Sequence, residues 1–600
     1  MSENKIAKIP VASHGLHKHS YNYPWLSSIN FGDVMPCYIN TVRKGERDSP
    51  KAGMYSQLMP IAHNAFATGR YNFKAIFVPY KLVWRPWYYF DQQTQFNSNG
   101  SYYTPTRYPY ISHSNLSSAI LSDSTGYFST GTSSDYDVVA FTRTGSNKTY
   151  YKANASGARI LRILGALGCM PSFIEQDNEP INVLPILCYI KAFADYYYPN
   201  NYYGSVIYHK LMQFFDRDDS DLNFLANEIV EAIEICSRNF YEGSVFDLAW
   251  DNPVSPNEST VSPAVTIPDI TNDASITAGP LRQIVSNTPD GVSSPSNPAF
   301  IPSNGTPFVG GSVTSTSANA SGVLTKYVLD ALTAVTLWAK RRQLGGLKLI
   351  DRFLASRGVS LSNDSARISS YLGQRNVEIQ VSGVENNTDV NLGELAGRGI
   401  ASSGDSPLSF ECRAEDDGIF LVIVSALPDA NFPVLLDGFS TRKDFLQNYN
   451  AEYDKLGAAA VPSRIIQSSL DGSVNSFIVG TDFGNVFGFL NQYWDEVQER
   501  PRLLGDFILK SRGADSLSAY HTFRMLNSSL GRFHSYDFQR MSDASQYQRL
   551  FYSDKQENLM LFLRWYGEQY KEKLPLGDSY DWDDDELNRK VSVVTGGSQK

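Results

Sequence analysis

Two stretches of the chain have the hydrophobic pattern of β-strands. Residues 71–83 (YNFKAIFVPYKLV) alternate in part, with Phe73 and Phe77 on one side. Pro79 removes a ladder donor, which favours an edge or a bulge. Residues 418–427 (GIFLVIVSAL) are almost continuously apolar, as a strand covered on both faces would be. We predict a strand with an irregular end in the first stretch and a core strand in the second.

Helical spacing is found in fewer places. Apolar residues recur every three or four positions within 324–342, and a short helix is expected to follow at 347–357. Residues 221–236 and 554–570 also have helical spacing. These segments lie between short runs rich in Tyr, Phe, Val, Ile and Thr, which favour strands. We therefore predict a mainly β protein with a few inserted helices.

Composition separates a body from several polar segments. We expect a basic N-terminal arm at 1–30 and an acidic, polar C-terminal tail at 578–600. The body, 31–577, is predicted to be a single domain with two excursions. Residues 97–157 form a loop excursion rich in Tyr and Ser, and residues 251–322 form a surface insertion rich in Pro, Ser and Thr. The second segment cannot bury much apolar surface by itself, so we expect it to project outward.

Charge, hydropathy and cysteine usage exclude several classes of protein. Hydrophobic residues make up 42% of the chain and charged residues 19%, which excludes wholesale disorder. The net charge of -10 disfavours a protein that coats nucleic acid by bulk attraction. The five cysteines are an odd number, which indicates buried thiols in a reducing compartment. No secretory signal and no membrane span are expected from the apolar runs.

Candidate chemistry is sparse. The sequence has no glycine-rich phosphate loop, no HExxH, no CxxC and no nucleophile elbow. His17 with His19 could hold a metal, His534 with Asp537 could belong to a hydrolytic triad, and the acids of 583–586 could bind calcium. A solvated arm, a loop histidine and a solvated tail are the simpler interpretations. We therefore expect no enzyme, no cofactor and no metal site.

Candidate nucleic-acid contacts lie in the N-terminal arm. Its cations and the rings that follow them are Lys5, Lys8, Lys18, Tyr21, Tyr23 and Trp25. Cations for phosphates and rings for bases are the composition of a weak single-strand binder. An arm that docks on a neighbouring subunit fits the same residues equally well. The basic residues 340–342 suit phosphate contact or, more simply, a helix C-terminus.

Candidate core residues lie in one segment, 76–90 (IFVPYKLVWRPWYYF). This segment is too apolar for a loop free in solvent, and Pro79 and Pro86 interrupt any long ladder. We expect it to form a strand that leads into a packed turn. The residues predicted to be buried are Phe77, Trp84, Trp87 and Phe90.

Blocks of the sequence resemble the major capsid protein of the Microviridae, small bacteriophages with a circular single-stranded DNA genome. The opening blocks are FGDVMP at 31–36, TVRKGERD at 41–48, QLMPIAHNAF at 57–66 and the segment 76–90. The later blocks are LPILCYIKAFADYYYPN at 184–200, LWAKRRQLGGLKLIDRFLASRGV at 337–359, SYLGQ at 370–374, LGELAGRG at 392–399 and VFGFLNQYWDEVQERPRLLGDF at 486–507. Residues 439–457 match only loosely. The gokushovirus-like or Bacteroidetes-associated branch is the most similar.

The resemblance implies a fold and a function. The fold would be an eight-stranded antiparallel jelly roll of the viral capsid type, with long loop insertions and a few helices. Sixty copies would close a T=1 icosahedral shell around the DNA, after assembly in the cytoplasm of the host bacterium. The implied partners are a small basic DNA-packaging protein, an internal scaffolding protein, a minor pilot protein and the host cell surface. The virion is the implied location.

A second class of function stays open on the residues alone. A β-rich surface protein that binds or hydrolyses carbohydrate would use exposed Tyr and Trp side chains to stack on sugars. A pair of carboxyl groups would then act on the glycosidic bond.

Replacing Lys5, Lys8 and Lys18 together with Ala is expected to lower the DNA content of assembled particles while the subunit still folds. The cations are expected to neutralise phosphates, so their loss weakens retention of the genome. The ratio of absorbance at 260 and 280 nm of purified particles measures this. Particles with normal DNA content would contradict the assignment.

Overall fold

The structure is a computed structural model. It describes residues 10–12, 15–59, 69–98, 101–103, 105–122, 126–132, 138–144, 147–173, 177–197, 204–215, 217, 220–239, 354, 357–359, 367–384, 397–402, 407–428, 438–442, 448–451, 458–462, 486–491, 493–497, 559–573 and 591–593. The chain is mainly β with antiparallel sheets, as the sequence predicts.

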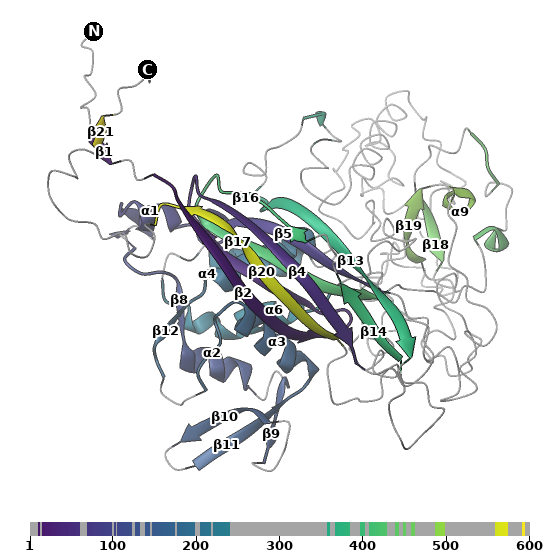
Figure 1. Ribbon diagram of the computed structural model, residues 1–600, viewed down its shortest axis with the longest axis horizontal. Coiled ribbons are helices and arrows are strands. Elements are labelled where there is room, and N and C mark those ends of the chain that lie inside the picture. The colour runs from purple at the N-terminus through teal and green to yellow at the C-terminus, as the bar shows by residue number, and fades with distance from the viewer. Residues whose placement is uncertain are drawn as a thin grey trace, which may run out of the picture.

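A ten-stranded sheet forms the body (Figure 1). Eight strands follow one another in the order β2-β20-β4-β14-β13-β5-β17-β3, and two short strands pair with β4. The bounds are β2 His17–Ile29, β3 Val34–Val42, β4 Arg47–Leu58, β5 Gly69–Pro79, β13 Ser370–Val384, β14 Gly397–Ser402, β15 Leu408–Ser409, β16 Cys412–Arg413, β17 Gly418–Pro428 and β20 Leu559–Lys571.

The sheet folds back on itself, because its first and last strands meet through side chains. The Tyr38 hydroxyl on β3 donates to the Tyr21 hydroxyl on β2 at 3.0 Å. The ring centroid of Tyr38 also lies 4.9 Å from that of Trp565 on β20. We call β2, β20, β4 and β14 the front layer, and β13, β5, β17 and β3 the back layer. Figure 1 shows the front layer from its outer side.

The two layers differ in how many of their faces are buried. In β20 of the front layer the burial alternates, so one face meets the back layer and the other meets solvent. Its inward residues are Leu559, Leu561, Leu563 and Trp565. The described residues of β17 are all buried, because helices cover the second face of the back layer. The continuous apolar run at 418–427 is therefore confirmed as a core strand.

The helices that cover the back layer come from the long connection between β5 and β13, whereas η5 and α9 follow β17. α4 contacts β5 and β17, and α3 contacts β3. Asn154 caps α3 by accepting from the Gly157 N–H at 2.8 Å, and Ser112 caps α2 in the same way. The bounds are α1 Trp87–Asp91, α2 His113–Ile120, α3 Ala155–Ala166, α4 Leu184–Tyr196, α5 Gly204–Phe215, α6 Ala226–Ile235 and α9 Trp494–Val497, with 3-10 helices η1 Tyr80–Leu82, η2 Asn223–Leu225 and η5 Gly438–Thr441.

Smaller sheets surround this body. They pair β1 with β21, β6 with β7, β8 with β12 and β18 with β19, and they order three strands as β10-β11-β9. The bounds are β1 Pro10–Ala12, β6 Phe96–Ser98, β7 Ser101–Tyr103, β8 Tyr110–Ser112, β9 Phe128–Gly131, β10 Val138–Thr144, β11 Asn147–Ala153, β12 Pro180–Asn182, β18 Ala458–Pro462, β19 Val486–Asn491 and β21 Val591–Val593.

The helix predicted at 554–570 is wrong, because residues 559–571 form the strand β20. Large apolar side chains occupy both faces of this strand, with Met560 and Phe562 outward and Leu561 and Leu563 inward. Apolar residues on both faces hide the period of two that would have indicated a strand. The helix predicted at 221–236 is confirmed by η2 and α6.

Three other expectations need correction. Pro79 ends β5, a central strand, so it does not mark an edge strand; it pairs with Gly418 of β17, while the pairing with β13 stops at Phe77, which gives the irregular strand end that was predicted. Residues 97–157 contain α2 and short strands instead of only a loop, and helices α3 to α5 were not expected. Residues 17–29 of the predicted arm form β2, paired with β20 along its whole length. The segments 251–322 and 324–342, most of 347–357 and residues 578–590 lie outside the described residues.

The candidate core residues lie at the end of β5 and in the turn that follows it. Phe77, Trp84 and Trp87 are buried, while Phe90 is half-buried and packs against the core. The Trp84 ring lies edge-on to Phe90, with centroids 5.8 Å apart. The indole N–H of Trp84 has no hydrogen-bond partner among the described residues, so packing rather than hydrogen bonding holds this ring.

Trp84→Ala is expected to lower the free energy of unfolding by about 3–5 kcal/mol, because it leaves a large cavity in the core. Trp84→Phe keeps an aromatic ring and removes a buried, unsatisfied N–H, so it should cost less, about 1–2 kcal/mol. Denaturant unfolding of the purified chain measures both. Equal stability of the Ala and Phe variants would contradict this placement of the core.

Candidate functional site

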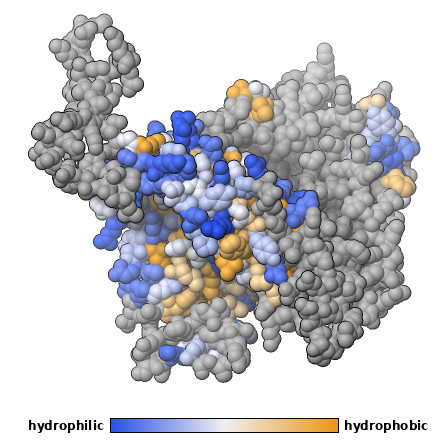
Figure 2. Space-filling view, viewed as in Figure 1, coloured by the Kyte–Doolittle hydropathy of each residue, from blue (hydrophilic) through white to orange (hydrophobic). Residues whose placement is uncertain are grey.

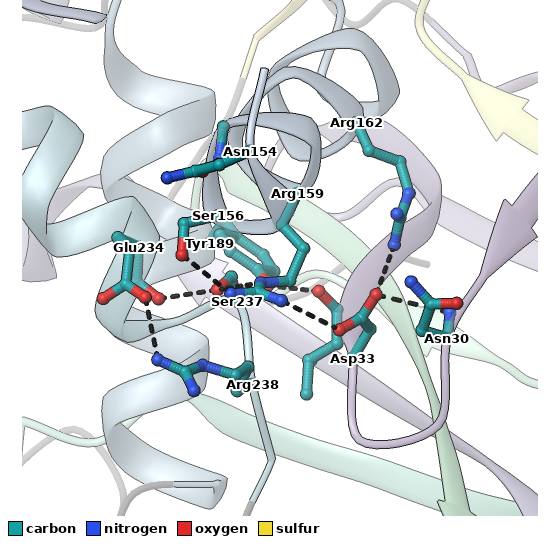
Figure 3. A network of polar contacts seen from close by, with 12 residues as sticks. Asn30, Asp33, Asn154, Ser156, Arg159, Arg162, Tyr189, Glu234, Ser237 and Arg238 are labelled. Atoms are coloured by element: carbon teal, nitrogen blue, oxygen red, sulfur yellow. Dashed lines mark hydrogen bonds and ion pairs between the residues drawn. The ribbon is translucent and has the colours of Figure 1, made fainter. Parts of the chain in front are cut away.

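A network of polar side chains joins the helices to the turn between β2 and β3. We call it the Asp33 network, and Figure 3 shows it from close by. Arg162 Nη1 donates to Asp33 Oδ2 at 2.7 Å, and Arg159 Nη1 lies 3.9 Å from Asp33 Oδ1. Both arginines lie on α3, one turn apart, so they reach the same carboxylate from one helix face.

The turn that carries Asp33 is held by backbone hydrogen bonds on both sides. Gly32 has a φ of 86°, a conformation that favours glycine, and its N–H donates to the Ala426 carbonyl of β17 at 2.8 Å. The Gly32 carbonyl accepts from the Asn239 N–H at 2.7 Å, and the Val34 N–H donates to the Ser237 carbonyl at 2.9 Å. The segment FGDVMP therefore lies between the end of α6 and the core strand β17.

Arg159 also hydrogen-bonds a serine of its own helix and a serine just after α6. Arg159 Nε donates to Ser237 Oγ at 3.2 Å, and its Nη2 donates to Ser156 Oγ at 2.8 Å. The side chains of Arg159 and Asp33 are 1% and 3% exposed. Because desolvation of such a pair is costly, its hydrogen bonds offset that cost only while every partner is present. This arrangement suits the positioning of two layers, because Asp33, Ser156 and Ser237 hold the two guanidinium groups between α3 and the turn before β3.

A second network lies inside the body, where the front and back layers meet. We call it the Asp48 network. Asp48 on β4 accepts from the Tyr38 hydroxyl at 2.6 Å, from Asn40 Nδ2 at 2.5 Å and from the Tyr21 hydroxyl at 3.2 Å. Burial raises the pKa of the Asp48 carboxyl, and these three donors oppose the rise. The network connects β2, β3 and β4 through one buried carboxylate.

The DNA-contact candidates are only partly placed. Lys5 and Lys8 lie outside the described residues. Lys18 is on β2, and its Nζ lies 2.5 Å from Glu568 Oε1 on the neighbouring strand. Both side chains are about half exposed, so this pair contributes little to stability.

The other candidate side chains form no site in the part of the chain that the structure describes. His17 and His19 are on β2, and His19 Nε2 lies 2.6 Å from the Lys573 carbonyl oxygen. No group of three His, Cys, Asp or Glu side chains that could hold a metal is found among the described residues. His534, Asp537 and residues 583–586 lie outside them, as do residues 340–342.

The five cysteines are buried free thiols, as predicted. Burial raises the pKa of Cys188 and Cys37, which keeps both groups protonated near neutral pH. They therefore act as small apolar side chains of the core. None of the described helices is long and apolar enough to span a membrane.

Sequence reasoning did not find the two networks. Asp33 and Arg159 are far apart in the chain, and neither belongs to a motif that links them. The only signal was local, since Gly32 and Asp33 fall within the FGDVMP block. No family model matches the sequence, and no curated protein sequence is significantly similar to it.

Asp33→Asn is expected to lower the free energy of unfolding by about 3–5 kcal/mol, because it leaves the guanidinium groups of Arg159 and Arg162 without their carboxylate. Lys18→Gln is the matched control, since it breaks an exposed ion pair and should cost less than about 1 kcal/mol. Denaturant unfolding of the purified chain compares the two. A loss for Asp33→Asn as small as that of the control would show that the network does not hold the layers together.

Proposed function

We propose that this chain is the major coat subunit of a small icosahedral shell that encloses circular single-stranded DNA, and that its body is a jelly roll. The strand order supports the jelly-roll part of the proposal. When the eight consecutive strands of the main sheet are numbered 1 to 8 in chain order, the front layer runs 1-8-3-6 and the back layer 5-4-7-2. A viral capsid jelly roll has this order in its two facing sheets.

The size of the connections supports a coat subunit over other jelly-roll proteins. Residues 80–369 join β5 to β13, and residues 429–558 join β17 to β20, so these two connections hold more than half of the chain. A subunit of a closed shell must present several different contact surfaces, and long connections provide them. Because jelly rolls also occur in lectins, the fold alone does not carry the function.

Four of the blocks that resemble microviral capsid proteins lie on elements that build the body. Residues 31–36 form the turn held by the Asp33 network, and residues 76–90 run from β5 into α1. Residues 184–200 contain α4, which covers the back layer, and residues 370–374 begin β13. The resemblance therefore concerns residues that determine the fold, which is what a shared architecture requires. The virion location and the scaffolding, DNA-packaging and pilot partners are part of the same proposal.

Expression of the full chain, alone and together with any scaffolding protein that it needs, is expected to yield closed particles far larger than the 66.9 kDa subunit. Negative-stain electron microscopy and sedimentation velocity detect them. The carbohydrate alternative predicts a chain that stays monomeric and binds or cleaves glycans. That outcome would contradict a coat function.

A further inference from the structure

The outer face of the front layer is open to solvent and has a distinct composition. Alternate residues of β20 point away from the back layer, and so do their neighbours on β2 and β4. Figure 2 shows this face, with hydrophilic residues over its upper part and hydrophobic ones toward its lower part. The outward residues of β20 are Met560, Phe562, Arg564, Tyr566, Glu568 and Tyr570.

Aromatic rings follow the middle of this face. Phe562, Tyr566 and Tyr570 occupy every second outward position of β20, which places them about 13 Å apart along the strand. Phe562 and Tyr566 are more than a third exposed. Tyr55 and Leu26 lie directly beside Phe562 on the neighbouring strands, and Leu26 is 75% exposed. Rings in such a row present their faces to a ligand that runs along the strand.

Cations flank these rings. Lys51 lies opposite Tyr566, while Arg47 on β4 and Lys18 on β2 lie on either side of Tyr570. Arg564 is on β20 itself, and its Nε donates to Asn22 Oδ1 at 3.0 Å. On these three strands the outward charges are Lys18, Arg47, Lys51, Arg564 and Glu568. β16 adds the exposed Arg413 opposite Arg47, and the exposed Glu411 precedes it.

This face is positive on a chain whose net charge is -10. Among the described residues, Lys18 pairs with the carboxylate of Glu568, whereas Arg47, Lys51 and Arg564 lie within 4 Å of no carboxylate. These three cations are exposed. A local excess of positive charge on an acidic protein attracts a polyanion to that face and repels it elsewhere.

We propose that the outer face of the front layer binds single-stranded nucleic acid. Unpaired bases can stack on Phe562, Tyr566 and Tyr570, while Arg47, Lys51 and Arg564 contact phosphates. Stacking needs unpaired bases, which favours a single strand over a duplex. A second copy of this acidic chain fits a positive face less well than a nucleic acid does. The assignment rests on the proposed function, because the enclosed genome would be the occupant and this face would line the inside of the shell.

Binding of fluorescein-labelled oligothymidylate to the purified, unassembled full chain tests the proposal by fluorescence anisotropy at salt concentrations from about 50 to 200 mM. The triple variant Arg47→Ala, Lys51→Ala, Arg564→Ala is expected to bind at least tenfold more weakly. Its plot of log affinity against log salt should lose about two units of slope, since each phosphate contact contributes ~0.7. The matched control is Lys44→Ala, Arg357→Ala, Arg375→Ala, which removes three exposed cations outside this face.

Tyr566→Ala is expected to weaken binding about tenfold without changing the slope, and Tyr566→Phe should bind like the wild type, because stacking needs only the ring. Absence of oligothymidylate binding by the wild type would overturn the proposal. So would equal losses in the triple variant and its control. A triple variant that alters only self-association in sedimentation velocity would assign the face to a second copy and would also overturn it.

Particle formation is scored separately in the same preparations. If the wild-type chain forms shells but its unassembled form does not bind oligothymidylate, this inference is overturned and the coat function stands. The wild-type chain could instead bind oligothymidylate without ever forming shells, with that binding lost in the triple variant. This result would contradict the coat function and support the face as a nucleic-acid surface.

Discussion

The strands β5 and β17 bury side chains on both of their faces, and the rest of the body depends on that constraint. A sheet of this composition is stable only when a second layer covers each side. The front layer covers one side, and α3 and α4 cover the other. The long connection that contains these helices is therefore part of the core rather than an addition to it.

The two polar networks determine where those layers sit. Buried ion pairs contribute little net stability compared with apolar residues of similar volume, but they disfavour any arrangement that leaves a charge without its partner. Asp33 positions α3 and the turn before β3, while Asp48 brings β2, β3 and β4 together. Hydrophobic burial supplies most of the driving force, and these carboxylates select one packing of the layers.

The sequence was informative where apolar residues form a nearly continuous run. The run at 418–427 and the apolar segment 76–90 both indicated buried positions from hydropathy alone. β20 was missed because its outer face mixes Met560, Phe562 and Tyr566 with charged residues, so no consistently polar side marks its period. The basic composition of residues 1–30 also assigned Lys18 to an N-terminal arm, whereas it lies in β2 and its cross-strand partner Glu568 is more than five hundred residues away. Pairings between distant segments leave no local signal, so neither network nor the aromatic row could be predicted.

The position of β20 between β2 and β4 has a consequence for synthesis of the protein. Both neighbours are made early, but the strand that joins them is not complete until residue 571 has been translated. Until then β2 lacks its pairing partner, and the two strands expose unpaired backbone edges to other chains. Contacts of such high sequence separation also form slowly. The last part of the body to be translated therefore controls when the front layer closes, and a nascent chain lacks that layer's completed surface until synthesis has passed this strand.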